Sequence, residues 1–165
     1  MHRMSDHDLL RWQFDLTWAL FEHHLERLVP EDHLWEPAGS VWTVRDGVPD
    51  WAETEPDPVP VPTIAWVSWH LGWWWSVAID HARERTPRDR VEITWPGPDL
   101  VVGRLRGLRD EWVELLPTLD LSAPSTFPWP DRTVGHTAAW VNAELMKNVT
   151  EIGQLRLLRA AAPGR

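Results

Sequence analysis

A tryptophan-rich segment, Thr63–His81, constrains the fold of this chain more than any other stretch. Its sequence is TIAWVSWHLGWWWSVAIDH, and it holds five of the 14 tryptophans, with His70 near its middle. Successive residues of an α-helix turn by about 100°, so a helix here would have one broad face made of Trp66, His70, Trp73, Trp74 and Val77. An imidazole within an apolar face needs a hydrogen bond, a carboxylate or a metal ion as its partner. The partner of His70 therefore decides what this chain can do.

Length and composition limit the chemistry that is available. A chain of 165 residues predicts one domain, residues 1–165, that is large enough to bury a core of its own. Cysteine is absent, which excludes disulfides, thiolate catalysis and thiolate metal sites. Any metal would have to be held by histidine, carboxylate, amide or water, and such ligands favour Zn, Ni, Fe or Mn.

The charge and the N-terminal sequence exclude two classes of partner. The formal net charge is −9 and the basic residues are scattered, whereas binding to a nucleic-acid backbone needs clustered Lys and Arg. The first residues, MHRMSDHDLL, lack the basic-then-apolar order of a signal peptide, and no apolar run approaches the ~20 residues of a membrane helix. We therefore expect a cytoplasmic protein without nucleic-acid or membrane partners.

Apolar periodicity predicts four long helices, over residues 5–29, 63–85, 99–116 and 133–160. Ser5 or Asp6, and Thr133, are suitable N-cap residues for the first and last of them. The apolar positions of the first helix are Leu9, Trp12, Leu16, Leu20, Leu25 and Leu28, with Phe14, Trp18 and Phe21 widening the stripe. The predicted fold class is therefore all-α, a four-helix bundle.

A long proline-rich connection, residues 36–62, joins the first two helices of the prediction. Alternate prolines in PDPVPVP forbid a helix and favour an extended path, and Val41–Val44 is a short β-prone piece. So long a connection is uncommon in a small domain and is often functional. Trp42 and Trp51 suggest that it is pinned to the body and covers something, although a packed crossover between helices explains it equally well.

The fourth helix carries the second informative pattern. Helical spacing places Glu144, Asn148 and Glu151 in one narrow stripe that borders the apolar side. Such side chains are costly to bury unless they are paired or bound to something. Two interpretations stay open: an exposed helix edge in which Lys147 neutralises a carboxylate, or a polar cluster that meets His70 inside the bundle.

Two motifs, WHLGWWW on the second helix and ELMKNVTEIGQL on the fourth, resemble the DinB/YfiT-like superfamily. The resemblance in layout spans nearly the whole chain and implies a four-helix bundle within a group of metalloenzymes that includes thiol-dependent transferases. In that family, one histidine of helix two and two histidines before a G-Q-[IL] turn of helix four hold a metal. His70 stands at the first ligand position and Gly153-Gln154-Leu155 matches the turn, but the other two positions fall at about Lys147 and Glu151.

This departure leaves two hypotheses. In the first, a rearranged site of His70, Glu151, Glu144 and Asn148 holds a divalent transition metal such as Zn or Ni. The protein would then be a metal-dependent transferase or hydrolase acting with a small thiol or a small apolar substrate. In the second, there is no metal cofactor, and a small-molecule-binding or interaction module keeps a pocket formed by Trp66, Trp73, Trp74 and Lys147. His70 would then form hydrogen bonds to Glu151 or Glu144. Because bundles often pair through a helix face, a homodimer is a further prediction.

Overall fold

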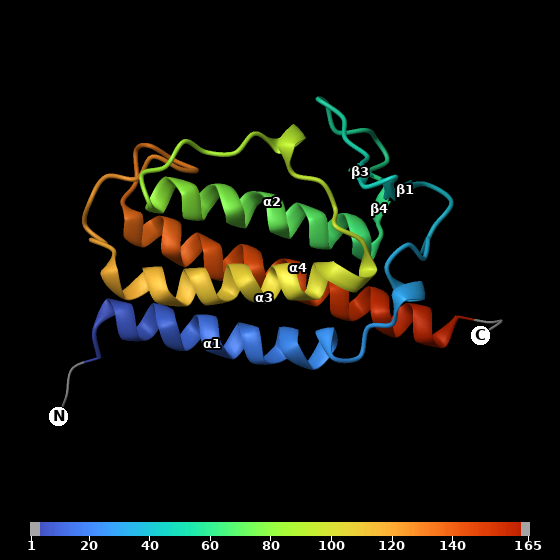
Figure 1. The fold of residues 1–165 in the computed structure, drawn as a ribbon, viewed down its shortest axis with the longest axis horizontal. Coiled ribbons are helices and arrows are strands. Elements are labelled where there is room, and N and C mark those ends of the chain that lie inside the picture. The colour runs from blue at the N-terminus through green and yellow to red at the C-terminus, as the bar shows by residue number, and fades with distance from the viewer. Residues whose placement is uncertain (1–3, 163–165) are drawn as a thin grey trace.

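Four long helices form most of the computed structural model, which describes residues 4–162 (Figure 1). They are α1 (Asp6–Leu25), α2 (Ile64–Ala82), α3 (Pro98–Leu115) and α4 (Val134–Ala161). The four helices lie side by side; α4 packs against α1 and α2, and α2 also packs against α3. Three 3-10 turns, η1 (Pro30–Asp32), η2 (Arg90–Glu92) and η3 (Leu116–Thr118), lie in the connections. The four predicted helices are thus confirmed, with ends that differ by a few residues. No helix within residues 4–162 is long and apolar enough to cross a membrane.

Local side-chain chemistry sets the helix starts. The Ser5 hydroxyl accepts a hydrogen bond from the Asp8 backbone N–H at 3.1 Å, and the Asp8 carboxylate accepts one from the Ser5 N–H at 3.1 Å. This reciprocal pair is a capping box. Thr63 caps α2 through its hydroxyl, which accepts from the Trp66 N–H at 3.2 Å. Thr133 is the N-cap residue of α4, as predicted.

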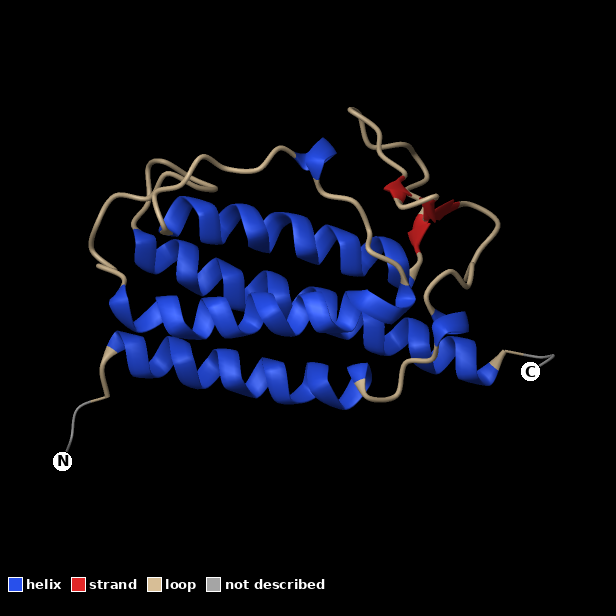
Figure 2. Cartoon of the chain, viewed as in Figure 1, coloured by secondary structure: helices blue, strands red, loops and turns tan. Residues whose placement is uncertain are grey.

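The connection between α1 and α2 contains short strands, so the all-α prediction is incomplete (Figure 2). Strand β1 (Val41–Trp42) pairs in parallel with β4 (Val61–Pro62) at the start of α2. Strand β2 (Val44–Arg45) pairs antiparallel with β3 (Val48–Pro49). The turn between β2 and β3 is Asp46-Gly47, with positive φ angles of 51° and 79°, which is the backbone that a two-residue hairpin loop requires.

Two tryptophans fasten this connection to α2, as the sequence suggested. The Trp42 ring stacks on Trp66 with centroids 5.9 Å apart. The Trp51 ring meets Trp69 and Trp73 edge-on, at 6.3 and 5.3 Å. The connection therefore contacts the N-terminal half of α2 through aromatic side chains.

The buried face of α1 differs from the simplest interpretation of its sequence. Its core residues are Phe14, Thr17, Trp18, Phe21 and Leu25. The other apolar stripe is on the surface, where Leu9, Trp12, Leu16 and Leu20 are 47, 61, 54 and 39 % exposed. Two apolar stripes share this helix, and the one with more aromatic rings occupies the core, because each ring buries a large area.

Helix α2 is the central element, since most of its residues are buried, including Trp69, Trp74 and Trp75. A helix that is apolar on nearly all sides must be covered on all sides. The segment after α2 runs back along it (Figure 1), and its Ile93 carbonyl accepts a hydrogen bond from Trp69 Nε1 at 2.6 Å. Close packing continues between α1 and α4, where the His24 ring occupies the space that a side chain at Gly153 would need.

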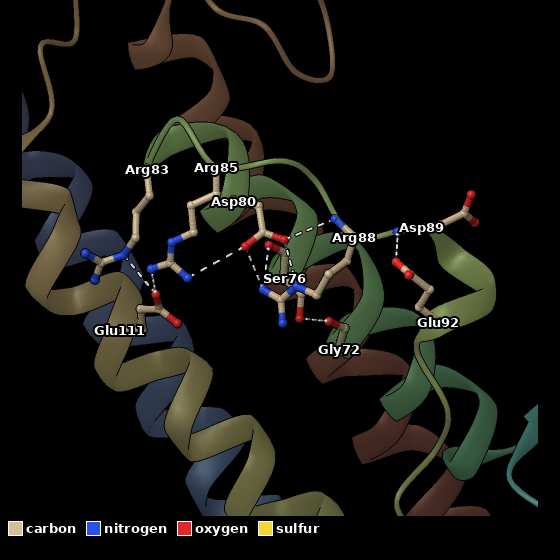
Figure 3. Close-up of polar contacts among 9 residues, drawn as sticks. All are labelled: Gly72, Ser76, Asp80, Arg83, Arg85, Arg88, Asp89, Glu92 and Glu111. Atoms are coloured by element: carbon tan, nitrogen blue, oxygen red, sulfur yellow. Dashed lines mark hydrogen bonds and ion pairs between the residues drawn. The ribbon is translucent and has the colours of Figure 1, made fainter.

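An ion pair between the buried Asp80 and the half-exposed Arg88 holds the returning segment to the end of α2 (Figure 3). Asp80 is 3 % exposed, and its carboxylate accepts hydrogen bonds from Arg88 Nε at 2.7 Å, Arg88 Nη2 at 2.9 Å and the Arg88 backbone N–H at 3.2 Å. Burial alone would raise the pKa of Asp80, but the hydrogen bonds and charge of Arg88, with the charge of Arg85, hold it below its usual value. Arg83 and Arg85 each reach Glu111 of α3 at 2.8 Å, so the same cluster also ties α2 to α3.

Candidate functional site

Two cavities meet at His70. The smaller, about 270 Å³, is lined by His70, Trp73, Trp74, Val77, Phe127, Trp140 and Glu144. The larger, about 440 Å³, lies beneath the proline-rich connection and includes Trp42, Trp51, Trp66, His70, Lys147, Asn148 and Glu151 in its lining. The structure thus places Trp73 and Trp74 on one cavity, Trp66 and Lys147 on the other, and His70 on both.

The His70 imidazole is held by rings rather than by hydrogen bonds. It stacks on Trp66, with centroids 5.1 Å apart and planes at 8°, and meets the Trp73 ring edge-on at 5.7 Å. Its Nδ1 is enclosed and has no hydrogen-bond partner among the described residues. The metal-free hypothesis predicted a hydrogen bond from His70 to Glu144 or Glu151. His70 Nδ1 forms neither of these bonds.

The surroundings of His70 keep it uncharged at neutral pH. Burial lowers its pKa to about 4, and the Lys147 charge acts in the same direction, while Glu144 acts weakly against both. A histidine with this pKa is neutral at pH 7. It therefore offers the cavities a polar but uncharged ring.

Aromatic side chains from three parts of the chain wall the smaller cavity. Trp140 of α4 packs edge-on against Trp74 at 5.2 Å and against Phe127 at 5.5 Å. Phe127 comes from the loop before α4, and its carbonyl accepts hydrogen bonds from the hydroxyls of Ser125 and Thr137, both at 2.7 Å. These bonds fasten the loop, so the walls of the cavity are formed before any ligand enters.

Each polar residue of the α4 stripe has a partner within the protein. Lys147 Nζ lies 2.6 Å from Glu144 Oε1. Asn148 is 1 % exposed; its Oδ1 accepts from Trp74 Nε1 at 2.9 Å, and its Nδ2 donates to Glu151 Oε2 at 2.8 Å. Lys147 neutralises Glu144 at the helix edge, as the first interpretation predicted, whereas Asn148 and Glu151 contact each other and Trp74 rather than His70.

This arrangement does not match a set of metal ligands. Within residues 4–162, no group of three or more His, Cys, Asp or Glu side chains is placed to hold a metal ion. One predicted ligand, Glu144, forms an ion pair with the Lys147 ammonium. That ammonium would repel a metal cation bound to Glu144. The set His70, Glu144, Asn148 and Glu151 stays a prediction, as does the alternative without a metal cofactor.

Sequence reasoning missed part of this site. Trp140 lies four residues before Glu144, so the same helical face carries both, and this spacing could have identified it. Phe127 gave no such signal, because its position depends on how a loop folds back onto α2. That Trp42 and Trp51 line a cavity could not be predicted without knowing the path of the proline-rich connection.

The fold and the site define a class: a small helical protein with aromatic-lined cavities around one half-buried, neutral imidazole. A family model described as the DinB superfamily matches residues 13–152. The chain therefore belongs to the DinB superfamily, as its motifs indicated. No curated protein and no solved structure matches the chain.

Proposed function

We propose that this DinB superfamily protein binds a small, largely apolar ring compound in the smaller cavity, through aromatic contacts and without a metal ion. The observation that supports this is the cavity of about 270 Å³ walled by Trp73, Trp74, Phe127, Trp140 and His70. Small-molecule sites are concave, mostly apolar and largely pre-formed, with few polar groups that fix orientation. Here those groups are the His70 imidazole and the Glu144 carboxylate.

Filling this cavity is expected to abolish binding. Val77 lines it and is 8 % exposed, so Val77→Phe puts a ring where the ligand would lie. We expect indole, 2-naphthol or benzimidazole to bind the wild-type protein, and Val77→Phe to weaken that binding at least about tenfold. Isothermal titration calorimetry measures this directly, and circular dichroism checks that the variant is folded.

The matched control is Trp129→Ala. Trp129 packs against Trp140 at 5.9 Å, is 47 % exposed and does not line the cavity. Its removal is expected to change the affinity less than about twofold. If none of the three compounds binds, or if Val77→Phe binds as tightly as the wild type, this proposal is wrong.

The metal-dependent hypothesis predicts a different result from the same protein. A metal-dependent transferase or hydrolase, purified without a metal-affinity tag, should contain or take up about one equivalent of Zn or Ni, and His70→Gln should lose it. That outcome in elemental analysis would overturn the metal-free proposal. Binding of a ring compound by metal-free protein would support it.

We further propose that two copies pair through α1. Its surface stripe of Leu9, Trp12, Leu16 and Leu20 has no cover within residues 4–162. A two-fold pair that brings the α1 stripes of two copies together would cover these four side chains.

The mass in solution tests this interface. Light scattering after size-exclusion chromatography should give twice the 19.2 kDa of one chain, and Trp12→Glu should give a single chain, because it places a charge in the centre of the stripe. Leu100→Glu is the control, since Leu100 is a 65 % exposed leucine on α3. A wild-type protein that stays monomeric at high micromolar concentration excludes the pair.

A further inference from the structure

The larger cavity combines indole rings with carboxylates. Its tryptophans, Trp42, Trp51 and Trp66, come from the proline-rich connection and from α2. Its acids are Glu53 and Glu55 of the connection and Glu151 of α4. The smaller cavity, in contrast, has a single carboxylate in its lining.

The charges of the larger cavity are not balanced. Lys147 is the basic residue in its lining, and Glu144 already holds that ammonium at 2.6 Å. Glu151 accepts one hydrogen bond, from the neutral amide of Asn148. Within the described part of the chain, no ion pair is formed by Glu53, Glu55 or Glu151. The cavity therefore presents three carboxylates without a cation of the protein to neutralise them.

One of the tryptophans already attracts a cation. The Arg90 guanidinium carbon lies 4.3 Å from the centroid of the Trp51 ring, a cation–π contact. Indole rings are the best aromatic partners for cations, and walls of several aromatic rings are used to recognise quaternary ammonium groups. Trp42, Trp51 and Trp66 with nearby carboxylates have the composition of such a site.

We propose that the larger cavity binds an organic ammonium ion, with the cationic group among Trp42, Trp51 and the three carboxylates. The two cavities share His70 in their linings, so the ammonium site lies next to the site proposed for the apolar ring compound. This assignment rests on the proposed function, because it names the charge of the molecule that the site near His70 binds. It also gives a role to the proline-rich connection, which supplies two of the rings and two of the acids.

Two probes of nearly equal shape test the charge requirement. Choline and 3,3-dimethylbutan-1-ol differ in that a quaternary nitrogen replaces a quaternary carbon. We expect calorimetry to show choline binding at least about tenfold more tightly than the alcohol. Equal affinity for the two probes, or no binding of choline, overturns the inference.

Variants locate the site. The double variant Glu53→Gln with Glu55→Gln changes two exposed residues of a loop and leaves the core intact, and Glu151→Gln keeps the shape of the residue that Asn148 contacts. Each is expected to weaken choline binding about fivefold or more, whereas Glu114→Gln, an exposed carboxylate on α3, should leave it unchanged. An equal loss in all three variants would show a general effect of net charge and would contradict the site.

The indole titration separates this inference from the proposed function. If indole binds and Val77→Phe prevents it while choline does not bind, the inference fails and the proposed function stands. If neither probe binds, both fail. If choline binds and indole does not, the proposed apolar ligand is wrong and the ammonium site remains.

Discussion

Replacing Asp80 with alanine is expected to lower the free energy of unfolding by about 2–3 kcal/mol, because hydrogen bonds to a buried carboxylate are lost while the half-exposed Arg88 side chain regains water. The Asp80 carboxylate is 3 % exposed and receives three hydrogen bonds from Arg88. Without it, the Arg88 guanidinium keeps only its bond to the Ser76 carbonyl, at 3.2 Å. Urea denaturation at pH 7, followed by circular dichroism, measures the loss.

Two comparisons make this result specific. Asp110→Ala, at an exposed ion pair with Arg109, should cost less than about 1 kcal/mol. Asp80→Ala combined with Arg88→Ala should cost clearly less than the sum of the single changes, because the two residues act as a unit. Additive losses, or a small loss for Asp80→Ala alone, would show that the pair contributes little.

Acid should weaken the same contact. The folded-state pKa of Asp80 is held below its unfolded value of about 3.9, so its stabilising effect is complete above that pH. It is lost as the pH falls through the lower folded-state pKa. Asp80→Asn should therefore remove part of the acid sensitivity of the protein below about pH 4.

His70→Gln is expected to remove a loss of stability that the wild type shows as the pH falls below about 6.5. The folded-state pKa of His70 is about 4, below the value of about 6.5 for a free histidine. Between these values the unfolded chain binds a proton that the folded chain does not, so the free energy of unfolding falls as the pH is lowered from 7 to 4. The free energy of unfolding lost through His70 over this pH range is roughly 2–3 kcal/mol. Glutamine does not bind a proton, so the His70→Gln variant does not have this loss.

Denaturation of both proteins at pH 7, 5.5 and 4.5 measures this difference. The other titrating groups are common to both chains, so their contributions largely cancel in the comparison. The two stability curves should separate progressively below about pH 6.5. Parallel curves would mean that His70 takes up a proton in the folded protein as easily as in the unfolded one, and that its enclosure among the rings is incomplete.

Local signals were enough to predict the four helices. Ser5, Thr63 and the prolines near helix starts act within a few residues, so a sequence shows them directly. The face of α2 was also predictable, because His70, Trp73, Trp74 and Val77 follow one helical period and line one cavity. The face of α1 was not, since two apolar stripes compete on it and packing against α4 selects one.

The partners of the charged and polar side chains could not be predicted from the sequence. Asp80 and Arg88 lie in different elements, and nothing in their spacing indicates that the segment after α2 turns back. The partner of Lys147 was ambiguous, because Glu144 and Glu151 lie at suitable helical distances on either side; the ion pair forms with Glu144. Glu151 instead contacts Asn148, whose own position depends on Trp74.

The parallel pairing of β1 with β4 brings together the two ends of the loop that lines the larger cavity. Because Val41–Trp42 and Val61–Pro62 lie side by side, the 18 residues between them leave and return at one point next to α2. Val44 of this loop belongs to the core and Trp51 packs on α2, whereas Glu53, Glu55 and Val59 are exposed. Changes at these exposed positions are expected to alter one wall of the larger cavity while the helices keep their packing. The proposed ligand specificity of the larger cavity can therefore be tested by exchanging these exposed loop positions alone.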